Sequence, residues 1–132
     1  MTIARSTGAL MGTDETTGVT IAAGNSNTAT EVDVLADNTS SGEVSLFLTF
    51  TPAVIPTKGD LVVSVTDGRV TAKHYQDPLK TWRVPLAGLP ASQATIFLGR
   101  FKASRYHKAA VKNNGDQSLG NVAVLYALEK TT

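Results

Sequence analysis

The stretch Glu43-Val-Ser-Leu-Phe-Leu-Thr-Phe50 decides the fold class of this chain. Every second side chain in it is large and apolar, and these side chains share one face of an extended backbone: Val44, Leu46, Leu48 and Phe50. The opposite face carries Ser45, Phe47 and Thr49. A period of two is the pattern of a β-strand with one buried face. We therefore expect residues 43–50 to form a strand whose even-numbered side chains enter a core.

Segments of a similar kind lie on both sides of this stretch. Residues 30–35 place Val32 and Val34 on one face and acidic residues on the other. Further strands are predicted at residues 18–23, 60–66, 81–85, 94–98, 106–112 and 120–128. Turn-forming residues separate the segments at short intervals, which is typical of a β-sandwich or a jelly roll. The sequence thus predicts an all-β, two-sheet, jelly-roll-like sandwich of about eight strands, with the strand order left open.

Three local signals refine the positions of these strands. The last strand, residues 120–128, is apolar on both faces, which indicates a central strand or a protein contact on its outer side. The dipeptide Asp67-Gly68 lies between two valine-containing segments and predicts a hairpin with a tight turn. Pro85 has no backbone N–H to donate, so residues 81–85 are expected at a sheet edge or at a strand end.

Residues 1–16 show no clear period and contain several turn formers, so we expect an N-terminal arm there. Its apolar side chains, Ile3, Leu10 and Met11, favour an arm that docks on a neighbouring protein over a purely solvated tail. The remaining residues, 17–132, have the length of one domain. The expected organisation is therefore an arm followed by a single β-sandwich domain.

The composition agrees with a β-rich core and argues against several classes of partner. Of the 132 residues, 35 are Thr, Val or Ile, whose branched side chains suit a pleated sheet. The net charge of +1 is a poor match for duplex nucleic acid or for an anionic membrane. There is no cysteine, which excludes disulfides and thiolate sites. No apolar run is long enough for a membrane span, and residues 1–12 lack the apolar region of a secretory signal.

No residue pattern points to catalysis. Neither the nucleophile elbow G-x-S-x-G nor a glycine-rich phosphate loop occurs. The two histidines, His74 and His107, are not spaced as zinc ligands. The carboxylates of Glu31 and Asp33 fall on the solvated side of their strand. We therefore expect no enzyme activity, no cofactor and no bound metal.

A modest basic stretch at residues 100–112 contains five cations, with Phe101 and Tyr106 between them. Cations interleaved with aromatic residues are a weak signal for binding single-stranded nucleic acid. Charged outward side chains also protect a strand edge against unwanted pairing. We favour the second interpretation, because acidic residues elsewhere cancel the field, and we expect no nucleic-acid partner.

Three segments of the C-terminal third are distinctive: Leu98-Gly-Arg-Phe-Lys-Ala-Ser-Arg-Tyr106, Val111-Lys-Asn-Asn-Gly115 and Asn121-Val-Ala-Val-Leu125. An earlier segment, Ser45-Leu-Phe-Leu-Thr-Phe50 with the prolines that follow it, belongs with them. In these segments the chain resembles small virion structural proteins of tailed bacteriophages. Together these segments, counted through Pro56, contain 31 of the 132 residues. The resemblance implies a jelly roll or related sandwich in the mature virion. Proteins of this group include head decoration (cement) proteins, often trimers over capsid threefold positions, and head-fibre, neck and tail components.

The sequence therefore predicts a capsid decoration protein on the exterior of the virion, which binds the major capsid protein as a homo-oligomer, with a trimer favoured. Such a protein needs large, mostly uncharged contact surfaces. The predicted contact residues are Ile3, Leu10 and Met11 in the arm and Phe101, Arg105 and Tyr106 in the domain. Two alternatives remain open: a neck, tail or head-fibre subunit, and a carbohydrate-binding module. The second alternative would rely on Trp82, Tyr75 and Tyr106, although core burial is the expected place of Trp82.

Overall fold

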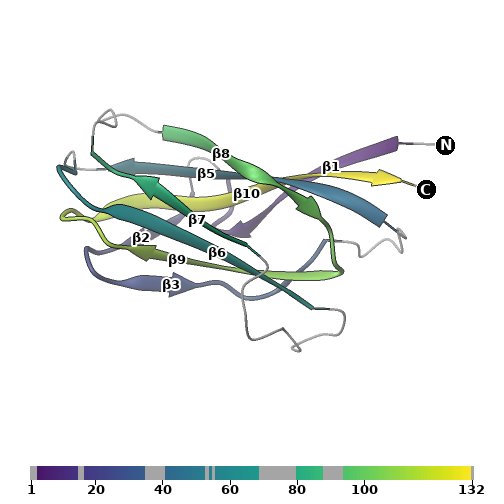
Figure 1. The fold of residues 1–132 in the computed structure, drawn as a ribbon, viewed down its shortest axis with the longest axis horizontal. Coiled ribbons are helices and arrows are strands. Elements are labelled where there is room, and N and C mark those ends of the chain that lie inside the picture. Colours follow the sequence, from purple (N-terminus) through teal and green to yellow (C-terminus); the bar gives the residue numbers. More distant parts are fainter. Residues whose placement is uncertain are drawn as a thin grey trace.

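The computed structural model describes residues 3–14, 17–34, 41–52, 54, 56–68, 80–87 and 94–131, and it forms two antiparallel sheets packed as a sandwich (Figure 1). Sheet A contains, in spatial order, β1 (Ile3–Met11), β10 (Leu119–Thr131), β5 (Ser41–Pro52) and β8 (Ala94–Lys102), and β2 (Val19–Ile21) also pairs with β10. Sheet B contains β3 (Ser26–Thr28), β9 (Tyr106–Asn113), β6 (Asp60–Gly68) and β7 (Lys80–Pro85), and β4 (Val32–Asp33) also pairs with β9. The predicted all-β sandwich is confirmed.

The strand pairs are nested along the chain. The first strand, β1, pairs with the last, β10, and β3 and β4 pair with β9. Further inward, β5 pairs with β8 and β6 pairs with β7. This is the pattern of one long hairpin folded over on itself, and the contacts β10–β5 and β9–β6 then complete the two sheets. The topology is that of a jelly roll.

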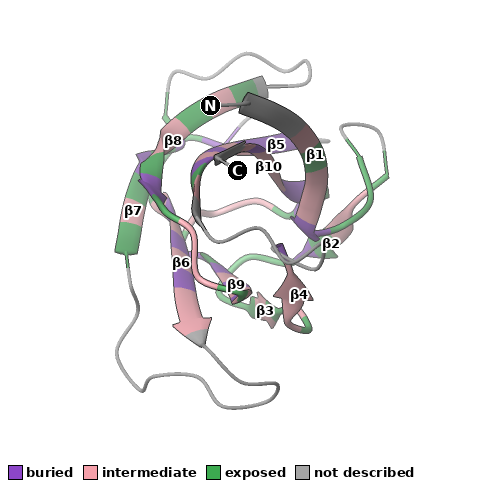
Figure 2. Ribbon diagram, turned by 90° about the vertical axis from the view of Figure 1, so that its right-hand side faces the viewer, coloured by how far each residue is buried: buried purple, intermediate pink, exposed green. Residues whose placement is uncertain are grey.

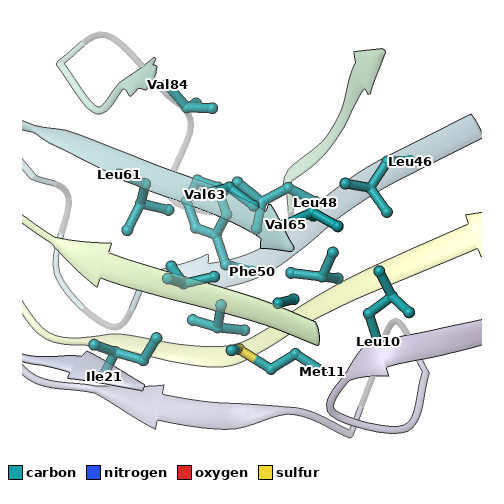
Figure 3. Packing of buried hydrophobic residues seen from close by; sticks show 14 of the residues in the cluster. Leu10, Met11, Ile21, Leu46, Leu48, Phe50, Leu61, Val63, Val65 and Val84 are labelled. Atoms are coloured by element: carbon teal, nitrogen blue, oxygen red, sulfur yellow. The ribbon is translucent and has the colours of Figure 1, made fainter. Parts of the chain in front are cut away.

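The core lies between the inner faces of the two sheets. From sheet A, β5 contributes the four apolar side chains whose burial the sequence predicted. None of them has any exposed surface: Val44, Leu46, Leu48 and Phe50. From sheet B, β6 contributes Leu61, Val63 and Val65, which are equally buried. Figure 3 shows Leu48 and Phe50 close to Val63 and Val65 of the facing sheet. Burial of this apolar surface is the main stabilising term in such a fold.

Strand β10 is central, as its two apolar faces predicted. It lies between β1 and β5, with β2 continuing the β1 edge. Its pairing register shifts between Gly120 and Ala123, where Asn121 has a φ of 51°. A bulge of this kind adds a residue to one strand and re-aims the side chains that follow. As a result Val124 and Leu128 face the core, while Leu125 reaches the outer face.

The predicted N-terminal arm is corrected to a strand for residues 3–11. This segment, β1, pairs with β10 from Ile3↔Thr131 to Met11↔Val124, and both chain ends lie at one end of the sandwich (Figure 1). A register shift between Ala9 and Met11 interrupts the alternation, which hid the strand from a period-two reading. Strand β3 lies where no strand was predicted, so the described residues form ten strands rather than about eight.

The tight turn predicted at Asp67-Gly68 is also corrected. Both residues belong to β6, where Asp67 pairs with His107 and Gly68 with Tyr106. Pairing with β9 overrides the local preference of the dipeptide, because it extends the ladder of backbone hydrogen bonds between the two strands. The prediction for Pro85 is confirmed, since β7 is an edge strand and Pro85 is its last residue.

Candidate interaction surface

The pairing register of sheet A lines up four apolar side chains on its outer face. Ala9 lies opposite Leu125, Leu125 opposite Phe47, and Phe47 opposite Phe97, so the row crosses all four long strands. We call these four residues the outer band. Phe97 is 55 % exposed and the other three are half-buried. The rings of Phe47 and Phe97 touch, with centroids 5.4 Å apart and planes inclined at 53°.

Polar side chains lie along one side of the outer band, and a turn of the backbone lies along the other. On one side Arg100 reaches over the sheet, with Nε 3.4 Å from Glu43 Oε1, a terminal guanidinium nitrogen 4.0 Å from Glu129 Oε1, and a hydrogen bond donated to Ser45 Oγ. On the other side the turn after β1 covers Ala123, since a Cβ on Gly12 would lie 3.0 Å from the Ala123 Cβ. The band itself contains no charged residue.

The outer face of sheet B is different in kind. The corresponding row across its strands is Thr28, Ala110, Ser64 and Thr81. The hydroxyls of Ser64 and Thr81 lie 3.5 Å apart. Figure 2, which looks at the end carrying both termini, shows β7 largely exposed at the edge of this sheet. Sheet B therefore turns a hydrated face outward, as antiparallel sheets commonly do.

The structure places three of the predicted contact residues in the core rather than at the surface. Leu10 and Met11 are each 2 % exposed and Phe101 is 6 % exposed. They lie on inward-facing positions of β1 and β8. The register shift between Ala9 and Met11 allows the adjacent side chains of Leu10 and Met11 both to face inward. Ile3, the first residue of β1, pairs with Thr131 of β10, and its side chain is not among those that the structure describes.

Tyr106 is the first residue of β9, on sheet B, and Arg105 directly precedes it, so neither joins the outer band. Arg105 Nε is 3.0 Å from Asp33 Oδ2, and the guanidinium carbon lies 5.3 Å from the centre of the Tyr106 ring. The hydrogen bond to Asp33, followed by its negative charge, raises the pKa of Arg105 above its ordinary value. These contacts hold β4 against the start of β9.

His107 has a structural place. Its ring is fully buried, and Nε2 accepts a hydrogen bond of 3.0 Å from the backbone N–H of Ser104. Nδ1 lies 3.3 Å from the carbonyl oxygen of Thr66, so in the neutral ring the proton sits on Nδ1. His74 lies outside the described residues. Within the described part of the chain, no group of three or more His, Cys, Asp and Glu side chains could hold a metal ion.

The aromatic residues of the carbohydrate alternative do not form a common platform among the described residues. Trp82, on β7, faces inward, and a Cβ on Gly99 would lie 3.1 Å from its Nε1. Its ring centre is 6.4 Å from that of Phe101. Tyr106 lies on β9, with β6 between it and β7. Tyr75 falls outside the described set.

No protein-family model and no curated protein sequence matches the chain. Among solved structures, the chain is similar to one in the structure of infectious bursal disease virus Gx strain, with a TM-score of 0.52, 14 % identity, and coverage of 97 % of this chain and 32 % of that one. This chain thus spans about a third of the viral chain, and the likeness shows the fold alone.

Two further similarities are weaker in shape. A Bacillus endospore appendage pilus structure gives a TM-score of 0.45 at 13 % identity, with 99 % of this chain and 90 % of that chain covered. A carbohydrate-binding module from Cellvibrio mixtus lichenase 5A gives 0.46 at 18 % identity, with 98 % and 87 % covered. Among the described residues, no helix has the length and apolar character needed to cross a membrane.

Proposed function

We propose that this protein is a virion structural protein of the capsid decoration type, which binds the major capsid protein at the outside of the assembled head through its outer band. The observation that carries the proposal is the uncharged apolar row on the outer face of sheet A, where Phe97 is 55 % exposed. An exposed apolar row of this kind is typical of a protein–protein contact. The same row is polar on sheet B.

The outer band has the properties of the centre of an interface. Phe47 and Phe97 are large, lie in contact, and offer apolar surface without charge to desolvate. Aromatic residues in such positions commonly carry most of the binding energy. A protein that binds the assembled shell and not its separate subunits stabilises the shell by that binding energy. Repetition over many capsid positions multiplies modest contacts by avidity.

The proposal has two further supports. The segments 98–106, 111–115 and 121–125 resemble tailed-phage virion proteins, and the jelly-roll fold also occurs in a chain from a virus structure. The proposal gives the protein no catalytic role and no cofactor. It assigns the protein to the virion exterior as a homo-oligomer, with a trimer favoured, which light scattering of the purified protein would test.

Binding to undecorated heads tests the proposed function. We expect the wild-type protein to co-sediment with heads, and the double variant Phe47→Ser, Phe97→Ser to bind at least about tenfold more weakly, because two interface aromatics are lost. The matched control is Ser64→Ala, Thr81→Ala, which changes the equivalent pair on sheet B and should bind as the wild type does. Failure of the wild type to bind heads, or equal binding by both double variants, would overturn the proposal.

The copy number in purified virions separates this role from a neck, tail or head-fibre subunit. A decoration protein repeats over the whole head surface, whereas a neck or tail subunit occurs only at one vertex. Quantitative gel analysis against the major capsid protein gives the ratio directly. A ratio near one protein per capsid subunit supports the decoration role, and a ratio far below it favours the neck, tail or head-fibre alternative.

A further inference from the structure

The connection between β9 and β10 contains the dipeptide Asn114-Gly115. In such a dipeptide the backbone nitrogen after the asparagine can approach the side-chain amide without hindrance, because glycine has no Cβ. We propose that Asn114 is a site of spontaneous deamidation and that Asp60, on β6, controls its rate. This inference is independent of the proposed function.

The reaction needs only water as a co-reactant. The backbone nitrogen of Gly115 loses its proton and attacks Cγ of Asn114, so that a C–N bond forms. The bond from Cγ to Nδ2 breaks, and the leaving nitrogen takes one proton from solvent to depart as ammonia, which balances the proton lost by Gly115. A cyclic succinimide remains. Water then adds to one of its two carbonyl carbons and opens the ring, which gives aspartate or isoaspartate at position 114.

Three hydrogen bonds hold the reacting groups in the folded protein. The leaving group, Nδ2 of Asn114, donates to Asp60 Oδ1 at 3.1 Å. The backbone N–H of Asn114 donates to the carbonyl oxygen of Asp60 at 2.9 Å. The nucleophile, the nitrogen of Gly115, donates its proton to Asn113 Oδ1 at 2.9 Å. The attack must break the third bond and turn the side chain out of the first, so the folded state slows the reaction.

Close packing restricts the backbone of this loop as well. Gly59, with a φ of 90°, passes so near the carbonyl oxygen of Asn114 that a Cβ would collide with it. A Cβ on Gly115 would lie 2.6 Å from Leu86 Cδ1. The loop thus packs between Gly59, which directly precedes β6, and Leu86, which directly follows β7. Asn114 itself remains exposed, so the water needed for ring opening can reach it.

The product would be less well suited to the loop than asparagine. Asn114 and then Arg83 donate hydrogen bonds to the Asp60 carboxylate and lower its pKa below the ordinary value. A carboxylate at position 114 replaces a donor to Asp60 with a like charge. Isoaspartate also adds a methylene to the backbone, which the close approach to Gly59 leaves no room for. Deamidation should therefore weaken the attachment of the β9–β10 connection to the start of β6.

Incubation of the full chain at mildly alkaline pH tests the inference, with peptide mass mapping of position 114. The unfolded protein in urea should convert Asn114 readily, and the folded protein should convert it more slowly. The variant Asp60→Ala should deamidate about fivefold faster than the folded wild type, the factor expected from the loss of one ordinary hydrogen bond. The matched control is Arg83→Gln, which removes the 3.1 Å ion pair with Asp60 and leaves the bond to Asn114.

The rates of conversion at Asn114 decide whether Asp60 controls the deamidation. Faster conversion in Asp60→Ala than in Arg83→Gln supports control by Asp60. Equal rates in these two variants, or equal rates in folded and unfolded wild type, overturn it. The comparison of folded with unfolded wild type needs no variant, so it stands even if Asp60→Ala does not fold.

Discussion

The two sheets of this sandwich have similarly apolar inner faces, but their outer faces differ in polarity. Inside, both present buried aliphatic side chains, such as Leu48 on sheet A and Val63 on sheet B. Outside, sheet A carries the Phe47–Phe97 contact, and the equivalent pair on sheet B is Ser64 and Thr81. The inner faces are constrained by packing in any sandwich. The outer faces are not, so packing within the domain does not account for an apolar row on one of them.

The largest expected effect is a difference in stability loss between the inner and the outer face of the strand pair β5 and β8. Phe50→Ala should lower the free energy of unfolding by about 3–5 kcal/mol, because it leaves a cavity in the core. Phe97→Ala should lower it by less than about 1.5 kcal/mol, since its ring is mostly in water and loses only one aromatic contact. Urea unfolding of both variants measures the difference. Equal losses would mean that the outer band is part of the fold's own packing.

The next effect compares the two outer faces directly. A double-mutant cycle on Phe47 and Phe97 should give a coupling of about 0.5–1.5 kcal/mol, the value of an aromatic pair in contact. The same cycle on Ser64 and Thr81 should give about 0.2 kcal/mol, since their hydroxyls are at the limit of a hydrogen bond. Thermal or urea unfolding provides both numbers. A larger coupling on sheet B would remove the distinction between the faces.

A smaller effect concerns the border of the outer band. Arg100→Gln removes the contacts to Glu43 and Glu129, all of them about half exposed. The free energy of unfolding should fall by less than about 1 kcal/mol, because solvent screens such pairs. The loss should vanish in about 1 M salt. Lys112→Gln, on the outer face of sheet B, serves as the control in the same titration. A loss that persists in salt would show that Arg100 acts through packing or through its hydrogen bond to Ser45 rather than through the ion pairs.

The smallest effect is a pH dependence at the end of sheet B. Hydrogen bonds from Asn114 and Arg83 lower the pKa of Asp60 in the folded protein. The stabilisation is therefore complete above the unfolded pKa of about 3.9 and is lost as the pH falls through the lower folded value. Asp60→Asn should flatten the decline in stability below about pH 4 relative to the wild type. Unfolding curves across that range test it, and an unchanged slope would contradict it.

Only part of the outer band could be predicted from the sequence. The alternation of residues 43–50 put Phe47 on the face opposite the core, and the last strand showed an apolar outer side. Phe97 and Ala9 carried no such signal, because nothing in a single strand says which strand lies beside it. The predicted contact residues Leu10, Met11 and Phe101 lie in the core, because apolar character alone does not distinguish a core position from an interface.

The sequence by itself determined the fold class, most of the strands, and the buried face of β5. Local alternation is sufficient for this, because the side-chain period of a strand is a property of its own backbone. The tertiary structure decided the nested strand order, turned residues 3–11 from an arm into β1, and aligned Ala9, Leu125, Phe47 and Phe97. These features depend on register between segments far apart in the chain, which long-range backbone hydrogen bonds and shared core packing fix only when the sheets form.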